Sequence, residues 1–412
     1  MSTRERVALW DRLRPGGAID DDELTARVVW SVLAEPGDGI AGSLIDDLGA
    51  AEALRLVLRR EPFSSPASAR AEAVVIAREV DRAYAERGLE RLSGVRAGFL
   101  RWHPRMTGEL IDTVFGMAAA SRCTLLLPGD EHWPEGVLSL GAHAPLLLWC
   151  LGDPGLLDDF ASSAALVGTR ASTGYGTHVA TELSAGLAER GWTVVSGGAY
   201  GIDAASHRAA LAAGGRTVSV MAGGLNSFYP TGNAELLARI AREGAVVAEV
   251  PFGTPPTPFR FLARNRLIAA MTSASVVVEA GLRSGSINTA NHCGKLGRPL
   301  GAVPGAVTSP ASAGCHLLLR ERRAQIVTSV DDVVRLAAGD EAVPLEPLAD
   351  PVDPRYERVT KALNARRGRP LSEVAAHAGM GETETAQLLG VLLLDGAVRK
   401  SDTGWVSVHR AR

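Results

Sequence analysis

Apolar residues in the middle of the chain come in short runs that alternate with longer helix-type segments. The runs are apolar throughout and rich in β-branched residues, which is typical of strands buried on both faces of a sheet. The predicted strands are 164–167, 193–196, 217–221, 245–250, 275–279 and 300–303. The predicted helices are 176–190, 202–213, 233–243, 262–271, 286–296 and 315–323. This alternation predicts a doubly wound, parallel α/β sheet.

The two ends of the chain show other patterns. Residues 1–121 have helical apolar spacing and predict an N-terminal helical region of the SAM or helix-hairpin type, whose acidic Asp46-Asp47 pair favours a scaffold or interaction role over DNA binding. The sheet domain is expected at 122–337. Four prolines mark 338–354 as a linker, and residues 355–412 predict three helices and a hairpin, the pattern of a winged helix.

Composition limits the class of protein. The chain has 412 residues, of which 46% are hydrophobic and 22% charged, as in soluble proteins of two or three domains. We expect no membrane span and, because the first thirty residues lack an apolar segment, a cytoplasmic location. The four cysteines lie far apart, which argues against disulfides and clustered zinc sites. No Gly-Lys-Ser/Thr sequence occurs, so a P-loop ATPase is excluded.

The net charge of −3 hides an asymmetry along the chain. Residues 1–163 hold 17 basic and 25 acidic side chains, whereas residues 164–334 hold 15 basic and 10 acidic ones. The basic sheet region predicts an anionic partner. Solvated helix faces would give the same counts, so charge alone leaves both interpretations open.

Ligands of open α/β sheets bind beyond the carboxyl ends of the strands, and the first polar segment at such an end is 167–176. A predicted strand ends at Gly168 and a helix begins near Tyr175 and Gly176, where backbone N–H groups attract a phosphate. Arg170 is placed to clamp the same anion with its guanidinium. The alternative is a plain strand–helix turn with a surface arginine.

A second segment follows the next predicted strand, from Ser196 to Asp203. Gly197 and Gly198 permit close approach of the backbone to a ligand. Asp203 is expected to cap the next helix or to orient a donor, and with His207 it forms a possible catalytic pair. Ser196 does not lie in a G-x-S-x-G elbow, which favours a packed, hydrogen-bonded histidine instead.

A third segment places Arg260, Arg264 and Arg266 within seven residues, interleaved with Phe259 and Phe261. Guanidinium groups on phosphates and rings on bases suit a single-stranded nucleic acid. The alternative makes one of these arginines a buried structural partner. In this segment, Asn265 separates the last two arginines.

The fourth segment contains Ser284, Gly285 and Ser286 just before a predicted helix, an N-terminal nest for an anion, with Thr289 one turn on. Glu279 at the preceding strand end is expected to fix a backbone group or an arginine. No second positioned carboxylate supports general acid–base catalysis, and no His or Cys spacing supports a metal, so we expect neither a catalytic residue nor a metal site.

These motifs, in this order, resemble the DNA-processing protein A (DprA/Smf) family over about residues 125–334. The resemblance rests on Gly168-Thr-Arg170, Tyr175-Gly176, Ser196 to Asp203 with His207, Tyr229-Pro230, Arg264-Asn265-Arg266, Ser284-Gly285-Ser286 with Thr289, and Pro304-Gly305. It implies an extended Rossmann-like domain that binds single-stranded DNA with little sequence preference, without a cofactor and without catalysis. It further implies a homodimer that protects incoming strands in natural transformation and helps to load the RecA recombinase. Arg170 would belong to the DNA pocket, with the Arg-Asn-Arg and Ser-Gly-Ser segments near it.

Three positions depart from the family pattern. Tyr200 stands where many members have arginine, Thr231 replaces a common basic residue, and Leu262 replaces a usual proline. We therefore expect fewer phosphate contacts, with Tyr200 able to stack on a base instead.

Two other functions stay open. One is a Rossmann-like nucleotide phosphoribohydrolase, but Ala306-Val307 after Pro304-Gly305 breaks the catalytic motif of that class. The other is a protein-interaction adaptor for which DNA is secondary.

Overall fold

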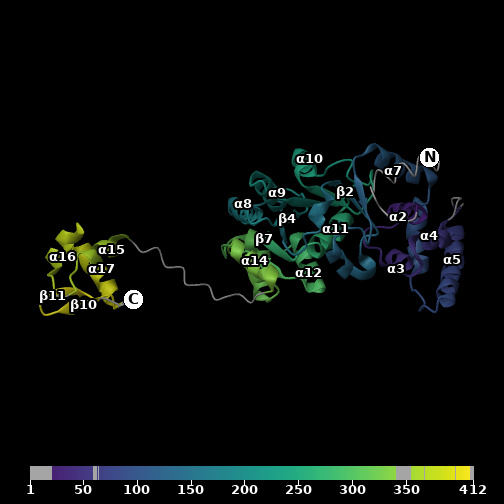
Figure 1. Cartoon of the computed structure of the whole chain (residues 1–412). Coiled ribbons are helices and arrows are strands. Elements are labelled where there is room, and N and C mark those ends of the chain that lie inside the picture. The colour runs from purple at the N-terminus through teal and green to yellow at the C-terminus, as the bar shows by residue number, and fades with distance from the viewer. Residues whose placement is uncertain are drawn as a thin grey trace. The chain divides into compact units, whose positions relative to one another are not determined.

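The structure, a computed structural model, describes residues 21–58, 63, 65–339, 354–365, 367–394 and 396–408. The chain divides into two compact units, Met1–Ala342 and Val343–Arg412 (Figure 1). Most of the predicted linker 338–354 falls on residues 340–353, which lie outside the described residues.

The larger unit is built on one nine-stranded sheet in the order β1-β2-β6-β5-β4-β3-β7-β8-β9. The strands are β1 (Thr124–Leu126), β2 (Leu148–Gly152), β3 (Ser163–Gly168), β4 (Thr193–Ser196), β5 (Thr217–Met221), β6 (Ala245–Ala248), β7 (Ala274–Glu279), β8 (Leu300–Ala302) and β9 (Gln325–Ile326). All strands from β6 to β9 in this order run parallel, whereas β1 and β2 add an antiparallel edge. The predicted doubly wound α/β sheet is confirmed.

Helices cover both faces of this sheet. They are α8 (Gly174–Glu189), α9 (Ile202–Ala212), α10 (Ala234–Glu243), α11 (Pro258–Ala270), α12 (Ser286–Leu296), α13 (Ala313–Arg320) and α14 (Val330–Ala338). Along β3, Ala164 and Leu166 pack with α8, α9 and α14, while Ala165 and Val167 pack with α11, α12 and α13. Both faces of the strand are therefore buried, which explains why its sequence is apolar throughout.

The order of the strands reverses between β3 and β7. From β3 the chain proceeds outward through β4, β5 and β6, and α11 then carries it back to β7 on the other side of β3. The connections that follow β3 and β7 consequently leave in opposite directions. Such a switch point opens a crevice at the carboxyl ends of the strands, which is where ligands of these folds bind.

The N-terminal helices share a core with the β1–β2–β6 side of the sheet (Figure 1). They are α2 (Asp21–Leu33), α3 (Gly39–Leu48), α4 (Ala50–Val57), α5 (Pro66–Glu86), α6 (Val95–Trp102) and α7 (Gly108–Ala120). Trp30 and Trp102 pack edge to face with ring centroids 5.0 Å apart, in the same hydrophobic cluster as Trp149 of β2 and Val246 of β6. The N-terminal helices and the sheet therefore form one compact unit.

Short 3-10 helices occupy several connections of the larger unit. They are η1 (His103–Arg105), η2 (Glu135–His143), η3 (Pro154–Leu157), η4 (Thr231–Asn233) and η5 (Pro310–Ser312).

The smaller unit contains the predicted three helices and hairpin. They are α15 (Pro354–Lys361), α16 (Leu371–Ala378), α17 (Glu382–Leu394), β10 (Val398–Ser401) and β11 (Gly404–Ser407). The two strands pair antiparallel, and Val359, Val374, Leu389 and Val398 form a separate core. The winged-helix assignment itself stays a prediction.

Two ion pairs tie α11 to its surroundings. Arg260 donates to both carboxylate oxygens of Glu35 at 2.9 Å, in the loop after α2. Arg266 donates to both oxygens of Glu249 at 2.7 and 2.8 Å, and Glu249 also accepts from the Gly37 N–H at 3.1 Å. Burial raises the pKa of Glu35, but Arg260 and Arg105 outweigh it and hold that pKa below its usual value. The helix and the α2–α3 loop are therefore fixed relative to each other.

We expect Arg266→Ala to destabilise the protein by about 3–5 kcal/mol, because it leaves the Glu249 carboxylate buried without its cation. The side chains of this pair are only 6% and 11% exposed. Denaturant unfolding followed by tryptophan fluorescence measures the loss. The control is Arg239→Ala, which breaks the solvent-exposed pair with Glu243 and should leave the unfolding midpoint nearly unchanged. Equal midpoints for the two variants would contradict a structural role for Arg266.

Candidate nucleic-acid interface

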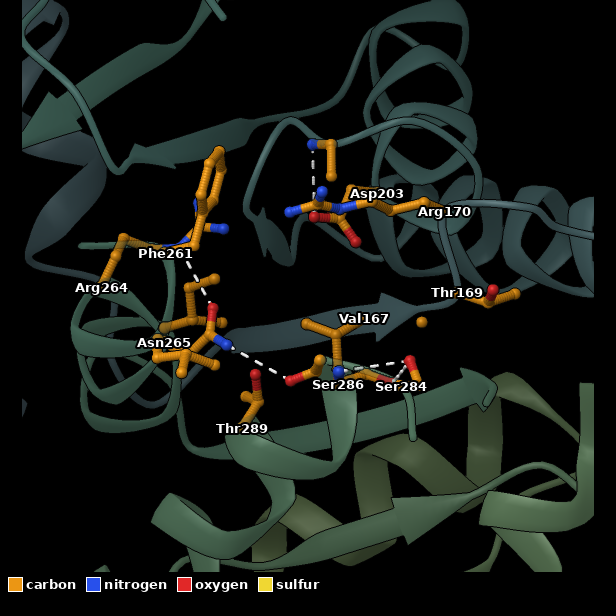
Figure 2. Close-up of a pocket in the computed structure, with 15 residues that line it drawn as sticks. Val167, Thr169, Arg170, Asp203, Phe261, Arg264, Asn265, Ser284, Ser286 and Thr289 are labelled. Carbon is orange, nitrogen blue, oxygen red and sulfur yellow. Dashed lines mark hydrogen bonds between the residues drawn. The ribbon is translucent and has the colours of Figure 1, made fainter. Parts of the chain in front are cut away.

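A cavity of about 390 Å³ lies at the switch point, bounded by the connections after β3, β4 and β7 and by α11 and α12 (Figure 2). The predicted site residues that line it are Gly168, Arg170, Arg264, Asn265, Ser284, Gly285, Ser286 and Thr289. Thr169, Ala199, Phe261 and Leu262 line it as well. The first and fourth predicted segments are thus brought together, because β3 and β7 are neighbours in the sheet.

Arg170 and Phe261 form one side of this cavity. The guanidinium carbon of Arg170 lies 4.8 Å from the centroid of the Phe261 ring, within cation–π distance. Arg170 is exposed and, unlike Arg260 and Arg266, has no ion-pair partner in the part of the chain that the structure describes. Its donors are available to an anion, and the neighbouring ring offers an apolar face.

The Ser284-Gly285-Ser286 turn lies across the cavity from Arg170 and Phe261 (Figure 2). The hydroxyl oxygens of Ser284 and Ser286 are 2.8 Å apart, and the Ser286 N–H donates to Ser284 Oγ at 3.3 Å. Asn265 Nδ2 donates to the Gly285 carbonyl at 3.3 Å and so fixes the turn from α11. The turn opens α12, whose first N–H groups and helix dipole favour a negative charge.

Arg264 forms the buried floor of the cavity. Its Nη1 donates to the Gly197 carbonyl at 2.8 Å and also to the Val220 carbonyl, while its Nε donates to Asn265 Oδ1 at 3.2 Å. Burial lowers the pKa of Arg264 to about 10, with the Asp203 charge acting in the opposite direction, so the side chain stays a cation at neutral pH. Arg264 thus ties α11 to the loop after β4 and to the strand β5.

Asp203 holds the loop after β4 through two hydrogen bonds. Its Oδ2 accepts from the N–H groups of Gly197 at 3.2 Å and Ala199 at 3.4 Å. Burial raises the pKa of Asp203, and the Arg264 charge together with these N–H groups offsets part of that rise. Of the two expected roles, Asp203 therefore orients backbone donors of this loop, whereas the N-cap of α9 is Gly201.

His207 is a packed, hydrogen-bonded core residue, as the sequence favoured. It is fully buried on α9, and its Nδ1 lies 2.7 Å from Thr217 Oγ1 on β5. Burial lowers the pKa of His207 to about 3, and the ring does not line the cavity. Since the Asp203 carboxylate is bonded to backbone N–H groups rather than to this ring, the two residues form no catalytic pair.

Glu279 fixes the start of α8, in line with its predicted role. Its carboxylate accepts from the Thr173 N–H at 2.8 Å and the Thr173 hydroxyl at 2.7 Å. A Cβ at Gly176 would lie 2.4 Å from Glu279 Oε2, so that position needs glycine. Tyr175 donates its hydroxyl to the Pro304 carbonyl at 2.6 Å. Tyr175 and Gly176 therefore shape the connection after β3 and do not line the cavity.

The three arginines of α11 do not form one binding face, which corrects the sequence-based expectation. Arg264 lines the cavity, whereas Arg260 and Arg266 are turned to Glu35 and Glu249. A buried cation requires a partner, and the partner of Arg260 is 225 residues away in the chain. The alternative interpretation made one of the three arginines a structural partner. The structure shows this role for both Arg260 and Arg266.

The remaining predicted residues follow β4 and lie beside the cavity. Ser196 donates its hydroxyl to the Leu166 carbonyl at 2.7 Å, and Gly197 and Gly198 pack against Arg264 and Leu237. Tyr200 is 47% exposed next to the cavity residue Ala199.

The structure adds lining residues that the predicted site did not include, and these are Val167, Thr169, Ala199, Asp203, Phe261, Leu262 and Ile268. Of these, Phe261 already belonged to the third predicted segment. Thr169 directly follows the predicted strand end at Gly168, and this adjacency is the signal that could have identified it.

No helix of the described residues is long and apolar enough to cross a membrane. Among the same residues, no group of three or more His, Cys, Asp or Glu side chains is placed to hold a metal ion.

Known proteins resemble this chain over most of its length. It is 47% identical over 300 residues to the putative DNA processing protein DprA of Mycobacterium tuberculosis H37Rv, covering 68% of this chain and 76% of the relative. It is 34% identical over 295 residues to protein Smf of Escherichia coli K12, covering 69% and 78%. The X-ray structure of DNA processing protein A from Streptococcus pneumoniae superposes with a TM-score of 0.58 at 27% identity, covering 78% of this chain and 99% of that one.

A family profile covers the sheet and the site together. The profile described as DNA recombination-mediator protein A matches residues 124–338, which run from β1 to the end of α14. The match includes every cavity residue, and it confirms the resemblance seen in the motifs. The chain belongs to the DNA recombination-mediator protein A family.

Proposed function

We propose that this protein binds single-stranded DNA in the switch-point cavity and acts as a recombination mediator, without catalysing a reaction on the strand. The observation that carries the proposal is the unpaired guanidinium of Arg170 against the face of Phe261. Guanidinium on phosphate and ring on base are the two contacts that single-strand binders combine. The Ser284–Ser286 turn supplies a second group of N–H donors for the backbone of the strand.

The geometry supports a single strand over a duplex. A base can lie against Phe261 only when it is not stacked and paired inside a helix. It also supports weak sequence preference, because the Asn265 amide, which could read a base edge, already bonds Gly285 and Asn288. The names printed for the family and for its relatives, a DNA recombination mediator and DNA processing proteins, agree with this function.

We propose in addition that the protein acts as a homodimer and delivers the bound strand to a RecA-type recombinase, as in natural transformation. The family resemblance supports both steps. An open cavity would hold the strand only through its backbone and a few bases. Such binding suits a mediator, because the rest of the strand stays accessible to the recombinase that receives it.

We expect Arg170→Ala to weaken binding of a single-stranded oligonucleotide about tenfold or more, because a charge-assisted phosphate contact is lost. The slope of log affinity against log salt should fall by about 0.7. Fluorescence anisotropy over a salt titration measures both. The control is Arg190→Ala, at the far end of α8, where Arg190 pairs with Asp331 at 2.6 Å.

Arg170→Lys adds a second comparison, since it keeps the charge but loses the guanidinium fork. It should retain the salt slope and recover part of the affinity. Affinity and slope that are the same for Arg170→Ala and Arg190→Ala would contradict the assignment, as would equal affinity for single-stranded and duplex DNA.

The rival function, hydrolysis of a nucleotide, lacks a positioned acid and base in the structure. Asp203 is the carboxylate among the described cavity residues, and its oxygen is bonded to the N–H groups of Gly197 and Ala199. We therefore expect no release of base from nucleoside monophosphates above the blank, measured by chromatography. Release that is abolished by Asp203→Asn would establish the hydrolase instead.

A further inference from the structure

Exposed aromatic side chains continue from the cavity toward the ends of β4 and β5. Tyr200 follows β4 and is 47% exposed, and Tyr229 lies in the connection after β5 and is 45% exposed. The Tyr229 ring lies 5.8 Å from the Phe261 ring, centroid to centroid, with 55° between their planes. We call Tyr200 and Tyr229 together the shelf. Through Tyr229, the shelf is in contact with the Phe261 ring that lines the cavity.

The shelf is held rigidly. The Tyr200 hydroxyl accepts from the Gly232 N–H at 3.2 Å. A Cβ on Gly232 would lie 3.1 Å from the Tyr200 ring and 2.6 Å from its hydroxyl, so the ring rests on a glycine. Asn233 Nδ2 donates to the Gly198 and Ala199 carbonyls at 3.1 Å each, which ties the segment after Tyr229 to the loop that carries Tyr200. Ordering these exposed rings for a ligand therefore costs little entropy.

The shelf offers stacking surface and little charge. Residues 229–233 contain no charged side chain, and Arg208, which contacts this segment, donates to Asn233 Oδ1 at 3.3 Å. An aromatic face accepts any base and is nearly independent of salt, in contrast to a phosphate contact. The chemistry therefore fits the bases of a single strand.

The order of the strands gives the path. The Ser284–Ser286 turn follows β7, Arg170 follows β3, Tyr200 follows β4 and Tyr229 follows β5, which are consecutive strands of the sheet. Three inter-strand steps of about 4.8 Å put the strands β7 and β5, which precede the turn and Tyr229, about 14 Å apart. This span exceeds a single nucleotide, so one strand that meets both must place different nucleotides on them.

We propose that the shelf is a second base-stacking site, which holds bases next to the one against Phe261. The strand then crosses the sheet edge from the Ser284–Ser286 turn, over Arg170 and Phe261, onto the shelf. This proposal rests on the proposed function, but it concerns a separate part of the surface and can fail separately.

The test uses full-length protein, a single-stranded oligothymidine and fluorescence anisotropy. The double variant Tyr200→Ala/Tyr229→Ala should bind about tenfold or more weakly, with an unchanged salt slope. The matched control Tyr200→Phe/Tyr229→Phe keeps both rings and loses only the hydrogen bond from Gly232, so it should keep most of the parental affinity. Circular dichroism and the unfolding midpoint show whether each variant is folded. Tyr200→Arg should steepen the salt slope, because it adds a phosphate contact.

Abasic substitutions scanned along the oligonucleotide locate the stacked bases. The parent chain should lose affinity at two separate sets of positions, and the double alanine variant should lose sensitivity at one of them. A folded double alanine variant that keeps parental affinity and the parental abasic profile would overturn the shelf, while the Arg170→Ala result would still decide the proposed function. Dissociation of a dimer in size-exclusion chromatography, with DNA affinity unchanged, would likewise overturn it and assign the rings to a protein contact.

Discussion

The buried guanidinium of Arg264 is the interaction on which the cavity depends. It extends from α11 beneath the sheet edge and donates to the carbonyls of Gly197 and Val220. A buried cation is tolerated only when its donors are filled and a counter-charge is near, which here is Asp203. The loop after β4, the strand β5 and the helix that carries Phe261 are consequently fixed as one piece, and the cavity beside them is preorganised.

The arginines of α11 mainly stabilise the fold, although the net positive charge of the sheet region suggests that they bind an anion. Arg260, Arg264 and Arg266 all belong to the basic sheet region, yet each is committed to carboxylate or carbonyl partners inside the protein. Glu35, from the acidic N-terminal region, neutralises Arg260. The positive excess of residues 164–334 therefore overstates the charge at the cavity, where Arg170 is the exposed cation among the described lining residues.

Local signals were enough to predict the elements of the sheet and many of the residues that line the switch-point cavity. Apolar strands are recognisable when both faces are buried, as in β3, and the polar residues Arg170 and Ser284 lie in the connections that follow such strands. The ion-pair partner of Arg260 could not be predicted from the sequence. Helical spacing indicates which residues share a face of the helix, but not which residues pack against that face. Glu35 is distant in the chain, and only the folded structure brings it to α11.

The shared core of the N-terminal helices and the sheet has a consequence for how this chain can vary. Arg260 needs a carboxylate from the loop after α2, and Trp149 of β2 lies in the cluster built around Trp30. The segment before β1 is therefore not an exchangeable module. A chimaera with the N-terminal region of a relative would have to bring both a carboxylate at the position of Glu35 and matching apolar volume, or α11 would lose one of its two ion pairs.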